Sequence, residues 1–437
     1  MTDETTPPAS SNNLLQHLRA ADIRGIAQLA TQGTLGVTSI VEGAQQSIWS
    51  TLGLPGGKEP GTTRGITGMV FQAVQGITQL VGQGADAVLT HLQPMLESMD
   101  QDKPESPQRA AVLSVLNGVI GDKLNASSNP LATPMSLRYQ GQALNWQTST
   151  PMPLVSGKVL VLVHGLCMND LQWNTQVGDA PPLDHGAALA DALGYTPVYA
   201  RYNSGLHTSQ NGRELSEHLQ QLVNHWPVPV QELTMVVHSM GGLVTRSAVH
   251  YAQAGTDAAG NTAAPSWLSV LKNIVFLGTP HHGAPLERAG NWVDVILGST
   301  PYTKPYAKLG HVRSAGITDL RYGYVADEDW QNQNRFHRKP DNRLHVALPE
   351  GVQCFTVAAT AASHRCSLAD KLVGDGLVPL KSALGQHENR LRTLAFPKSA
   401  RCIAYSMNHM ELLSSPEVNA HMVFWLSGGQ HGQRMAS

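Results

Sequence analysis

Three residues that could together carry out acyl transfer stand in separate segments of the chain. Ser239 lies in the segment HSMGG, Asp375 lies in GDGLVP, and His409 lies in NHMELL. A serine hydroxyl attacks a carbonyl carbon when a histidine takes its proton and a carboxylate holds the histidine ring in the right tautomer. These residue types predict nucleophilic catalysis by Ser239, with His409 as the base and Asp375 as the orienting acid.

Ser239 follows an apolar run and precedes two glycines, a pattern typical of a sharp turn between a strand and a helix. A small residue at Gly241 relieves crowding in such a turn, so that the hydroxyl projects above the sheet. The helix N-terminus behind it also favours nearby negative charge. The alternative is a serine that only caps the helix. We favour the nucleophile because the other segments accompany it.

The stretch VLVHG, which ends in His164 and Gly165, supplies a second feature of acyl transfer. Glycine permits a turn that points the next amide, that of Leu166, inward, and the amide of Met240 follows the serine. Two such amides could stabilise the negative charge of a tetrahedral intermediate as an oxyanion hole. We expect His164 and His238 to brace this site through hydrogen bonds. Taken alone, the HG pair could equally belong to a plain strand-to-helix turn.

Short apolar runs alternate with helical stretches from about residue 135 onward, after a hairpin or edge strand near residues 135–146. The expected strands cover residues 158–163, 197–202, 233–238, 273–278, 354–359 and 401–406. The expected helices cover residues 183–193, 213–226 and 241–254, and a last helix opens near residue 414. This alternation predicts an α/β fold with a mostly parallel sheet covered by helices on both faces. The candidate residues then lie beyond the carboxyl ends of strands, where such sheets bind ligands.

The region from about residue 160 to residue 426 resembles lipase-like α/β-hydrolases. The resemblance rests on HG at His164, HSMGG at His238, FLGTPHHG at Phe276, GDGLVP at Gly374 and NHMELLSSPEV at Asn408. These segments are similar to those of bacterial esterase and lipase proteins and, more distantly, of GPI inositol-deacylase-type lipases. The resemblance implies the α/β-hydrolase fold and ester hydrolysis through an acyl-enzyme, and the chain order Ser, Asp, His is the order of this architecture.

Val237 departs from this pattern, because the family usually has glycine two residues before the nucleophile. A branched side chain there must fit beneath the turn, so we expect a slightly wider local backbone. The class of chemistry does not depend on this detail.

Two further parts of the chain stand apart from the expected sheet. Residues 284–350 are too long for a simple connection and predict a cap or lid insertion, with an amphipathic helix at 286–298; an ordinary surface helix is the alternative.

Residues 1–130 are expected to form a helical accessory region, beside an α/β-hydrolase domain at 131–437. Segments that begin at Arg24 and Arg64 align without gaps, which indicates an internal duplication. Its spaced glycines favour close helix packing, and docking on a membrane is the alternative.

The composition excludes several classes of partner. The formal net charge of −2 gives no field that would attract nucleic acid. The acidic start lacks a signal-peptide core, and no apolar stretch reaches the roughly 18 residues of a membrane span. We therefore expect a cytoplasmic protein, with peripheral membrane association through residues 1–130 left open. Four cysteines without zinc-ligand spacing predict reduced thiols, with a Cys354–Cys402 disulfide as an alternative. Neither a metal nor a cofactor is expected.

The motifs together predict a serine ester hydrolase of the esterase or lipase type that acts on carboxylic esters, most simply those of acyl lipids. A thioesterase or polyester depolymerase would use the same three residues. A catalytically silent protein of the same fold that binds a lipid or acyl group is a further alternative. The expected partner in each case is a small-molecule or lipid ester.

Overall fold

The computed structural model describes residues 19, 21, 22, 24, 25 and 28, and then residues 105–147, 152, 155–175, 182–255, 266–284, 314–331, 341–363 and 374–429. The described residues form a central sheet of eight strands in the order β10-β9-β8-β7-β3-β6-β1-β2. The strands are β1 (Ser136–Tyr139), β2 (Gln142–Ala143), β3 (Lys158–Val163), β6 (Thr196–Arg201), β7 (Glu232–His238), β8 (Leu271–Leu277), β9 (Gln353–Thr360) and β10 (Arg401–Tyr405). A separate small ladder joins β4 (Asn174–Thr175) to β5 (Leu183–Asp184).

Six neighbouring strands, from β10 to β6, run parallel to one another. β1 pairs antiparallel with β6 and with β2, so the hairpin near residue 140 closes one edge of the sheet. The central strands are buried on both faces, which explains why their sequences are continuous runs of branched apolar residues rather than alternating ones. The sheet has the mostly parallel architecture that the sequence predicts.

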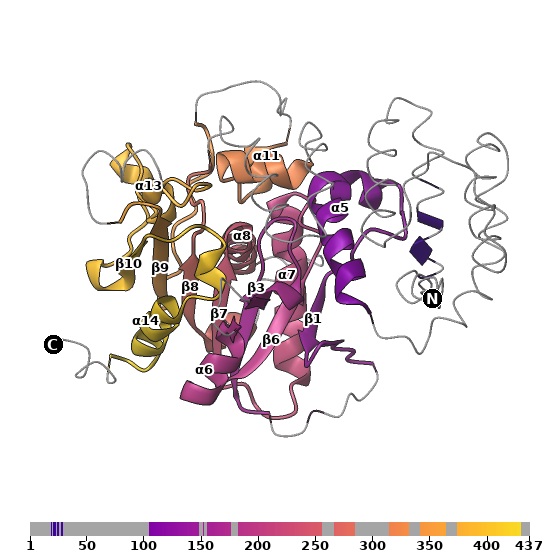
Figure 1. Ribbon diagram of the computed structural model, residues 1–437, viewed down its shortest axis with the longest axis horizontal. Helices are drawn as coiled ribbons and strands as arrows, with labels where there is room; N and C mark the ends of the chain where they lie inside the picture. The colour runs from indigo at the N-terminus through magenta and orange to yellow at the C-terminus, as the bar shows by residue number, and fades with distance from the viewer. Residues whose placement is uncertain are drawn as a thin grey trace, which may run out of the picture.

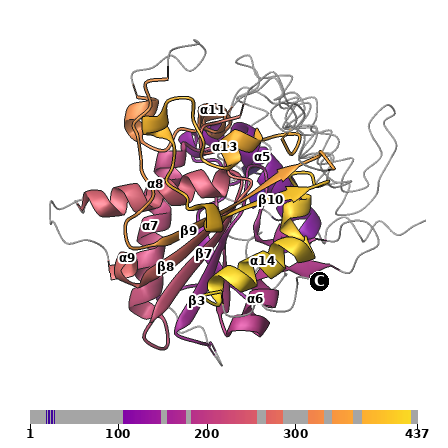
Figure 2. The same ribbon diagram turned by 90° about the vertical axis from the view of Figure 1, so that its left-hand side faces the viewer.

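Helices cover both faces of this sheet, as Figure 2 shows with the sheet seen nearly edge-on. One face carries α7 (Thr208–His225), α8 (Met240–Ala254) and α9 (Ser266–Val270), and the other carries α6 (His185–Leu193) and α14 (Pro416–Leu426). Local signals set their ends. The Asp184 side chain accepts the amides of Gly186 and Ala187 at the start of α6, and the Ser415 side chain caps α14 just before Pro416.

A third group of helices lies above the carboxyl ends of the strands (Figures 1 and 2): α5 (Pro107–Ala126), α11 (Ala315–Tyr322) and α13 (Leu380–Ala383). Their apolar side chains share one buried cluster with Leu166 and Met240, the two residues expected at the oxyanion hole. The cluster includes Val115, Leu116 and Val119 of α5 and Leu320 of α11. These helices therefore form an apolar roof over the end of the sheet that carries the predicted site.

Polar contacts fix α5 to the segments that follow two strands. The Asn203 side chain, after β6, donates to the Gly121 carbonyl at 2.9 Å, and the Ser314 hydroxyl donates to the Gly118 carbonyl at 2.7 Å. A Cβ atom on Gly118 would lie 2.2 Å from the Cys167 sulfur, so the helix approaches the loop after β3 as closely as glycine allows. The division into residues 1–130 and 131–437 stays a prediction. Wherever that boundary falls, α5 shares its core with the sheet.

Of the remaining sequence predictions, some lie outside the described ranges and others can be compared with the structure. The duplicated segments and the helix expected at 286–298 lie outside them almost entirely. Cys354 and Cys402 are free buried thiols in core clusters on opposite faces of the sheet, so the disulfide alternative is wrong. The ladders of β7 with β3 and with β8 pass through Val237 without a register shift, and its side chain is fully buried in the core.

Candidate active site

Ser239 stands between β7 and α8 in a backbone conformation that favours glycine. Its φ is 54° and its ψ is −122°, a region that costs a residue with a side chain about 1–3 kcal/mol. The Ser239 amide donates to the Leu277 carbonyl of β8 at 2.8 Å, and the Ser239 carbonyl accepts the Gly242 amide at 3.1 Å. These bonds to the neighbouring strand and to the helix hold the strained turn in place.

The Ser239 side chain does not cap the helix that it precedes. It occupies the N-cap position of α8 but makes no capping hydrogen bond. Its hydroxyl oxygen is buried, and within the described ranges it has no hydrogen-bond partner. The position of Ser239 therefore has a cost in backbone strain and in an unsatisfied hydroxyl that helix capping does not explain.

The two glycines after Ser239 let α8 pack tightly beneath the turn. A Cβ atom on Gly241 would lie 2.4 Å from the Val163 carbonyl oxygen and 2.6 Å from that of His164. A Cβ atom on Gly242 would lie 2.0 Å from the Thr279 hydroxyl oxygen. Only glycine fits these positions, because the first contact is with backbone that cannot move aside.

His409 and Asp375 form a buried pair at the ends of the chain segments that follow β10 and β9. The His409 Nδ1 atom lies 2.6 Å from Asp375 Oδ2, and the His409 amide donates to the Asp375 carbonyl at 3.2 Å. The other carboxylate oxygen, Oδ1, accepts the amides of Leu377 at 2.9 Å and Val378 at 2.7 Å. Both carboxylate oxygens are therefore occupied, and the carboxylate has one orientation relative to the imidazole.

His409 lies beside the turn that carries Ser239. The ring of His238, the residue before the serine, is 4.7 Å from the His409 ring between centroids, and His238 Nε2 lies 3.2 Å from the His409 carbonyl oxygen. A Cβ atom on Gly278, which follows the Leu277 partner of Ser239, would lie 2.9 Å from His409 Cε1. The fold thus brings the three predicted residues from three strand ends to one buried corner.

The loop after β3 carries Leu166 to the same corner. A Cβ atom on Gly165 would lie 3.0 Å from the Cβ atom of Ser239, so the two turns touch. Among the described residues, neither the Leu166 amide nor the Met240 amide has a hydrogen-bond acceptor. The turn after β3 and the turn that carries Ser239 therefore each hold one backbone donor without an acceptor among the described residues.

Residues that the sequence analysis did not single out hold this loop. Cys167 follows Leu166 with a φ of 58°, and its amide donates to the Ser204 hydroxyl at 3.0 Å. The Tyr202 hydroxyl donates to the His164 carbonyl at 2.8 Å, and the two rings stack with centroids 4.3 Å apart. Tyr202 and Ser204 directly follow β6. Their position after a strand, the feature that identified the other candidates, could have identified Tyr202 and Ser204 from the sequence.

Burial keeps His164 and His238 neutral. His164 is fully buried, which lowers its pKa to about 4, and its Nδ1 donates to the Gly165 carbonyl at 2.8 Å. Burial also lowers the pKa of His238 well below its ordinary value, and the adjacent His409 acts in the same direction. Both rings therefore brace the site through hydrogen bonds without adding positive charge to it.

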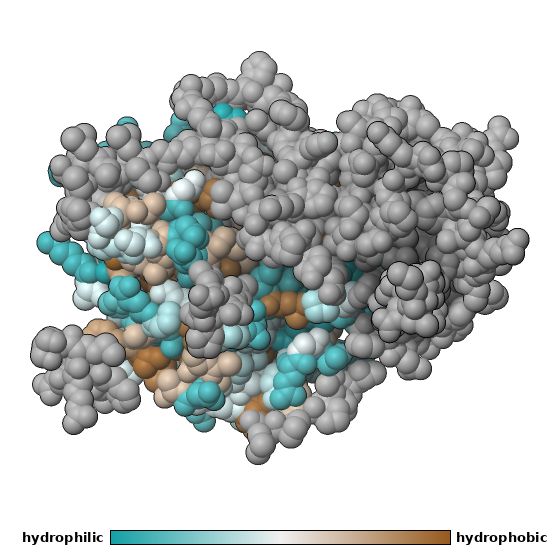
Figure 3. Space-filling model, viewed as in Figure 1, coloured by the Kyte–Doolittle hydropathy of each residue, from teal (hydrophilic) through white to brown (hydrophobic). Residues whose placement is uncertain are grey.

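Neither a cluster of metal ligands nor a membrane-spanning helix is found in the part of the chain that the structure describes. Across those residues no three His, Cys, Asp or Glu side chains gather closely enough to hold one. No described helix is long and apolar enough to cross a membrane. Hydrophilic and hydrophobic residues are interspersed on the coloured part of the face in Figure 3. The exposed large apolar side chains among the described residues are Leu171, Val228, Leu344, Leu391 and Phe424.

The sheet topology is that of the α/β-hydrolase fold, and comparison with known protein families agrees. Residues 154–366, nearly half of the chain, match the family described as "PGAP1-like alpha/beta domain". The match and the sheet topology agree with the α/β-hydrolase fold that the resemblance to lipase-like α/β-hydrolases implies. No curated protein matches the chain.

Several solved structures are weakly similar to the chain. A Bacillus licheniformis lipase in its mature form is 18% identical, with 64% of this chain and 94% of that chain covered and a TM-score of 0.37. A Staphylococcus hyicus lipase is 14% identical, with coverages of 65% and 100% and a TM-score of 0.37. An esterase from Pyrobaculum calidifontis is 10% identical, with coverages of 78% and 96% and a TM-score of 0.38. At such TM-scores these similarities carry no weight in the assignment.

Proposed function

We propose that the protein is a serine ester hydrolase with Ser239 as the nucleophile, His409 as the general base and Asp375 as the residue that orients it. The observation that carries the proposal is the strained backbone of Ser239 at the end of β7, beside the buried His409–Asp375 pair. Strain of this kind persists where function requires a side chain in an otherwise unfavourable position. The resemblance of the site motifs to those of lipases and esterases supports the same class of reaction.

The geometry suggests how each step would proceed. Asp375 accepts a hydrogen bond from Nδ1 of His409, which leaves Nε2 with a lone pair to take the Ser239 proton. The serine oxygen then bonds to the ester carbonyl carbon, and the carbonyl oxygen gains negative charge near the amides of Leu166 and Met240. His409 returns the proton to the leaving alcohol as the C–O bond breaks. Water, activated by the same imidazole, hydrolyses the acyl-enzyme and regenerates Ser239.

Acyl lipid esters are the substrates that we propose. The apolar roof formed by α5 and α11 packs directly on Leu166 and Met240, so an acyl chain next to the oxyanion hole would meet apolar side chains. A thioesterase or a polyester depolymerase could use the same residues, and a silent acyl-binding protein could keep the same fold. Chain-length and leaving-group series would separate these alternatives.

The test of the mechanism is a serine substitution with a matched control. Ser239→Ala should lower kcat on p-nitrophenyl esters by about 10³-fold or more and abolish labelling by a fluorophosphonate probe. Ser247→Ala is the control, because Ser247 is equally buried on α8 and also lacks a hydrogen-bond partner among the described residues. Turnover or labelling that survives in Ser239→Ala would overturn the assignment, and the absence of labelling in the unmodified protein would favour the silent binder.

For residues 1–130 we propose a role at a lipid surface. The support is compositional: duplicated helical segments with few charges. Close packing of these helices on one another, which their spaced glycines favour, is the alternative. The full chain should co-sediment with phosphatidylcholine vesicles, and the double change Val70→Glu and Val74→Glu in the second copy should reduce that fraction. Equal sedimentation of both proteins would count against the role, whatever the activity at Ser239.

A further inference from the structure

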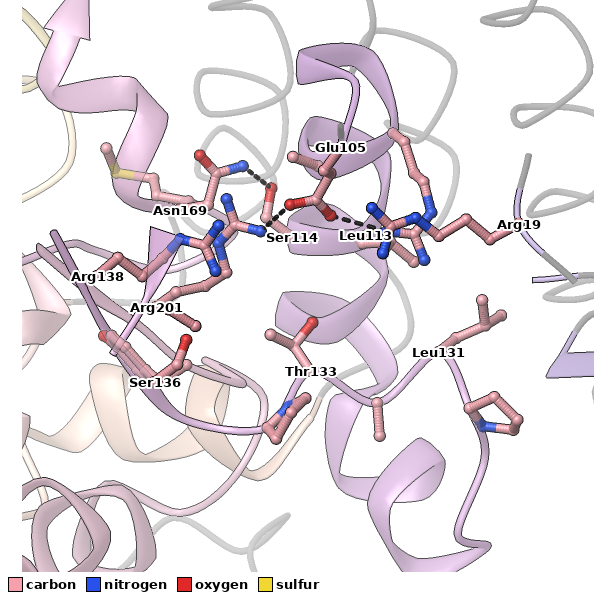
Figure 4. A pocket seen from close by; sticks show the side chains of 18 residues that line it. Arg19, Glu105, Leu113, Ser114, Leu131, Thr133, Ser136, Arg138, Asn169 and Arg201 are labelled. Carbon is pink, nitrogen blue, oxygen red and sulfur yellow. Dashed lines mark hydrogen bonds and ion pairs between the residues drawn. The ribbon is translucent and has the colours of Figure 1, made fainter. Parts of the chain in front are cut away.

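A cavity lies beside the loop that follows β3 and carries Leu166. It has a volume of about 280 Å³ and lies between α5, residues 130–134 and the β1–β6 edge of the sheet. Met168 and Asn169, two and three residues after Leu166, form part of its wall. Figure 4 shows the side chains that line it, with Arg138 and Arg201 side by side on one wall and α5 on another. None of the three proposed catalytic residues lines this cavity.

The lining of this cavity is rich in positive charge. Four arginines line it, Arg19, Arg109, Arg138 and Arg201, against one carboxylate, Glu105. Two further carboxylates, Asp22 and Asp170, pair with these arginines but do not line the cavity. Asp22 and Asp170 therefore contact the guanidinium groups from outside the cavity, and the residues that line the cavity carry more positive than negative charge.

Arg138 and Arg201 each have a guanidinium nitrogen without a hydrogen-bond acceptor among the described residues. Arg201 uses Nε for Asp170 and one terminal nitrogen for Glu105. Arg138 donates Nη2 to the Gly141 carbonyl at 2.6 Å, while its buried Nε lies 3.1 Å from Asp170 without the alignment of a hydrogen bond. Within the described ranges, Nη1 of Arg138 and Nη2 of Arg201 have no acceptor. Burial and the adjacent Arg201 lower the pKa of Arg138, and the carboxylates of Asp170 and Glu105 act in the opposite direction.

The rest of the lining is apolar or weakly polar. Leu113 and Ala110 of α5, Leu131, Pro134 and Met168 contribute carbon surface. Ser114 and Asn169 add a hydroxyl and an amide close to the Arg201 side of the cavity. The cavity volume is slightly below that of most small-molecule sites, which span roughly 300–1,000 Å³. A ligand that fits must be small, with a charged end and an apolar end.

We propose that this cavity binds an oxyanion group, carboxylate or phosphate monoester, attached to a short apolar chain. The oxyanion would accept hydrogen bonds from Arg138 and Arg201, whose planar guanidinium groups suit such oxygens. The apolar chain would lie against Leu113 and Leu131 of the opposite wall. This site is separate from the proposed hydrolytic site, and its existence does not depend on catalysis by Ser239.

The test is titration calorimetry of the full-length protein with four probes: hexanoate, hexyl phosphate, inorganic phosphate and hexanol. Hexanoate or hexyl phosphate should bind saturably, more weakly as salt rises, and more tightly than inorganic phosphate. Hexanol should not bind at the same concentrations. Whichever of the two chain-bearing anions binds more tightly identifies the head group. Inorganic phosphate that binds as tightly as hexyl phosphate would overturn the assignment of an apolar subsite.

Arg138→Gln should raise the Kd of the better probe about ten-fold or more, because it removes a charged donor while Asp170 keeps its pairing with Arg201. Arg213→Gln is the matched control, since Arg213 lies on α7, pairs with Asp327 and does not line the cavity. Thr133→Glu, a second variant, would place a carboxylate in the lining and should exclude the probes without removing an ion pair. If neither cavity variant weakens binding, the probe binds elsewhere, for example at the Ser239 site, and the proposal is refuted.

Discussion

Asp375→Asn is the substitution whose effect follows most directly from the geometry of the site. The Oδ1 atom of Asp375 accepts two backbone amides, and Oδ2 faces His409 Nδ1 at 2.6 Å. An asparagine has one oxygen, and the two amides would retain it at the Oδ1 position. Its NH₂ group would then face Nδ1 of His409. Two donors cannot share that contact, so the imidazole would shift its proton to Nε2.

A proton on Nε2 prevents His409 from accepting the Ser239 proton. We expect kcat for ester hydrolysis to fall about 10⁴-fold, which corresponds to about 5 kcal/mol in the activation free energy. The free energy of unfolding should change much less, by about 1 kcal/mol, because both backbone hydrogen bonds remain and only one charge-assisted bond becomes neutral. Asp375→Ala, by contrast, leaves two buried amides unsatisfied and should cost about 2–6 kcal/mol of stability.

The assay combines steady-state kinetics on a p-nitrophenyl ester with urea unfolding of the same preparations. Asp341→Asn is the control, because Asp341 is half-exposed and pairs with Arg343 away from the site. A folded Asp375→Asn protein with kcat within ten-fold of the unmodified protein would refute the assigned role of this carboxylate. If the loss of activity were explained by a matching loss in the free energy of unfolding, Asp375 would act only in folding.

Three further predictions follow from the same contacts. Gly241→Ala should cost about 3 kcal/mol of unfolding free energy by urea denaturation, because its Cβ meets backbone; Gly141→Ala, in open space at a φ of 78°, should cost only about 1 kcal/mol. The low pKa of His164, about 4 against 6.5, means that the unfolded state binds its proton first as pH falls. The contribution of His164 to the free energy of unfolding should therefore be present above pH 6.5, and its loss should lower that free energy by about 2 kcal/mol between pH 7 and pH 5. An equal free energy of unfolding at both pH values would refute this prediction. Burial raises the pKa of Cys167 to about 12, so iodoacetamide at pH 8 should modify it only after unfolding, as peptide mapping can check.

Much of the site could be predicted from sequence because its residues follow strands. Ser239 and Leu166 each follow a run of branched apolar residues, and those runs are strands β7 and β3 with nearly the expected bounds. Parallel strands place their carboxyl ends at one edge, so residues after them converge. His409 and Asp375, after β10 and β9, were placed in the same way. The strands are short and fully buried, which makes their sequence signal strong.

The support around the site could not be predicted in this way. Tyr202 and Ser204 hold the loop before and after Leu166 through side chains whose partners lie far away in the chain. α5 was assigned to the N-terminal region by its position in sequence, yet it packs on the loop after β3 through Gly118. Neither contact follows from periodicity, because both depend on how separate elements pack.

The sequence by itself determined the class of fold, the order of the strands along the chain and the identities of the residues at their ends. Local physics suffices for this, since strand and helix periodicity, glycine turns and caps act within a few residues. Tertiary structure alone decided the left-handed conformation of Ser239 and the pairing of both Asp375 oxygens. It also decided the gathering of Arg138 and Arg201 around a cavity with α5. These features arise from contacts between segments 30 to 100 residues apart in the chain, and such contacts form only when the whole sheet and its covering helices are in place.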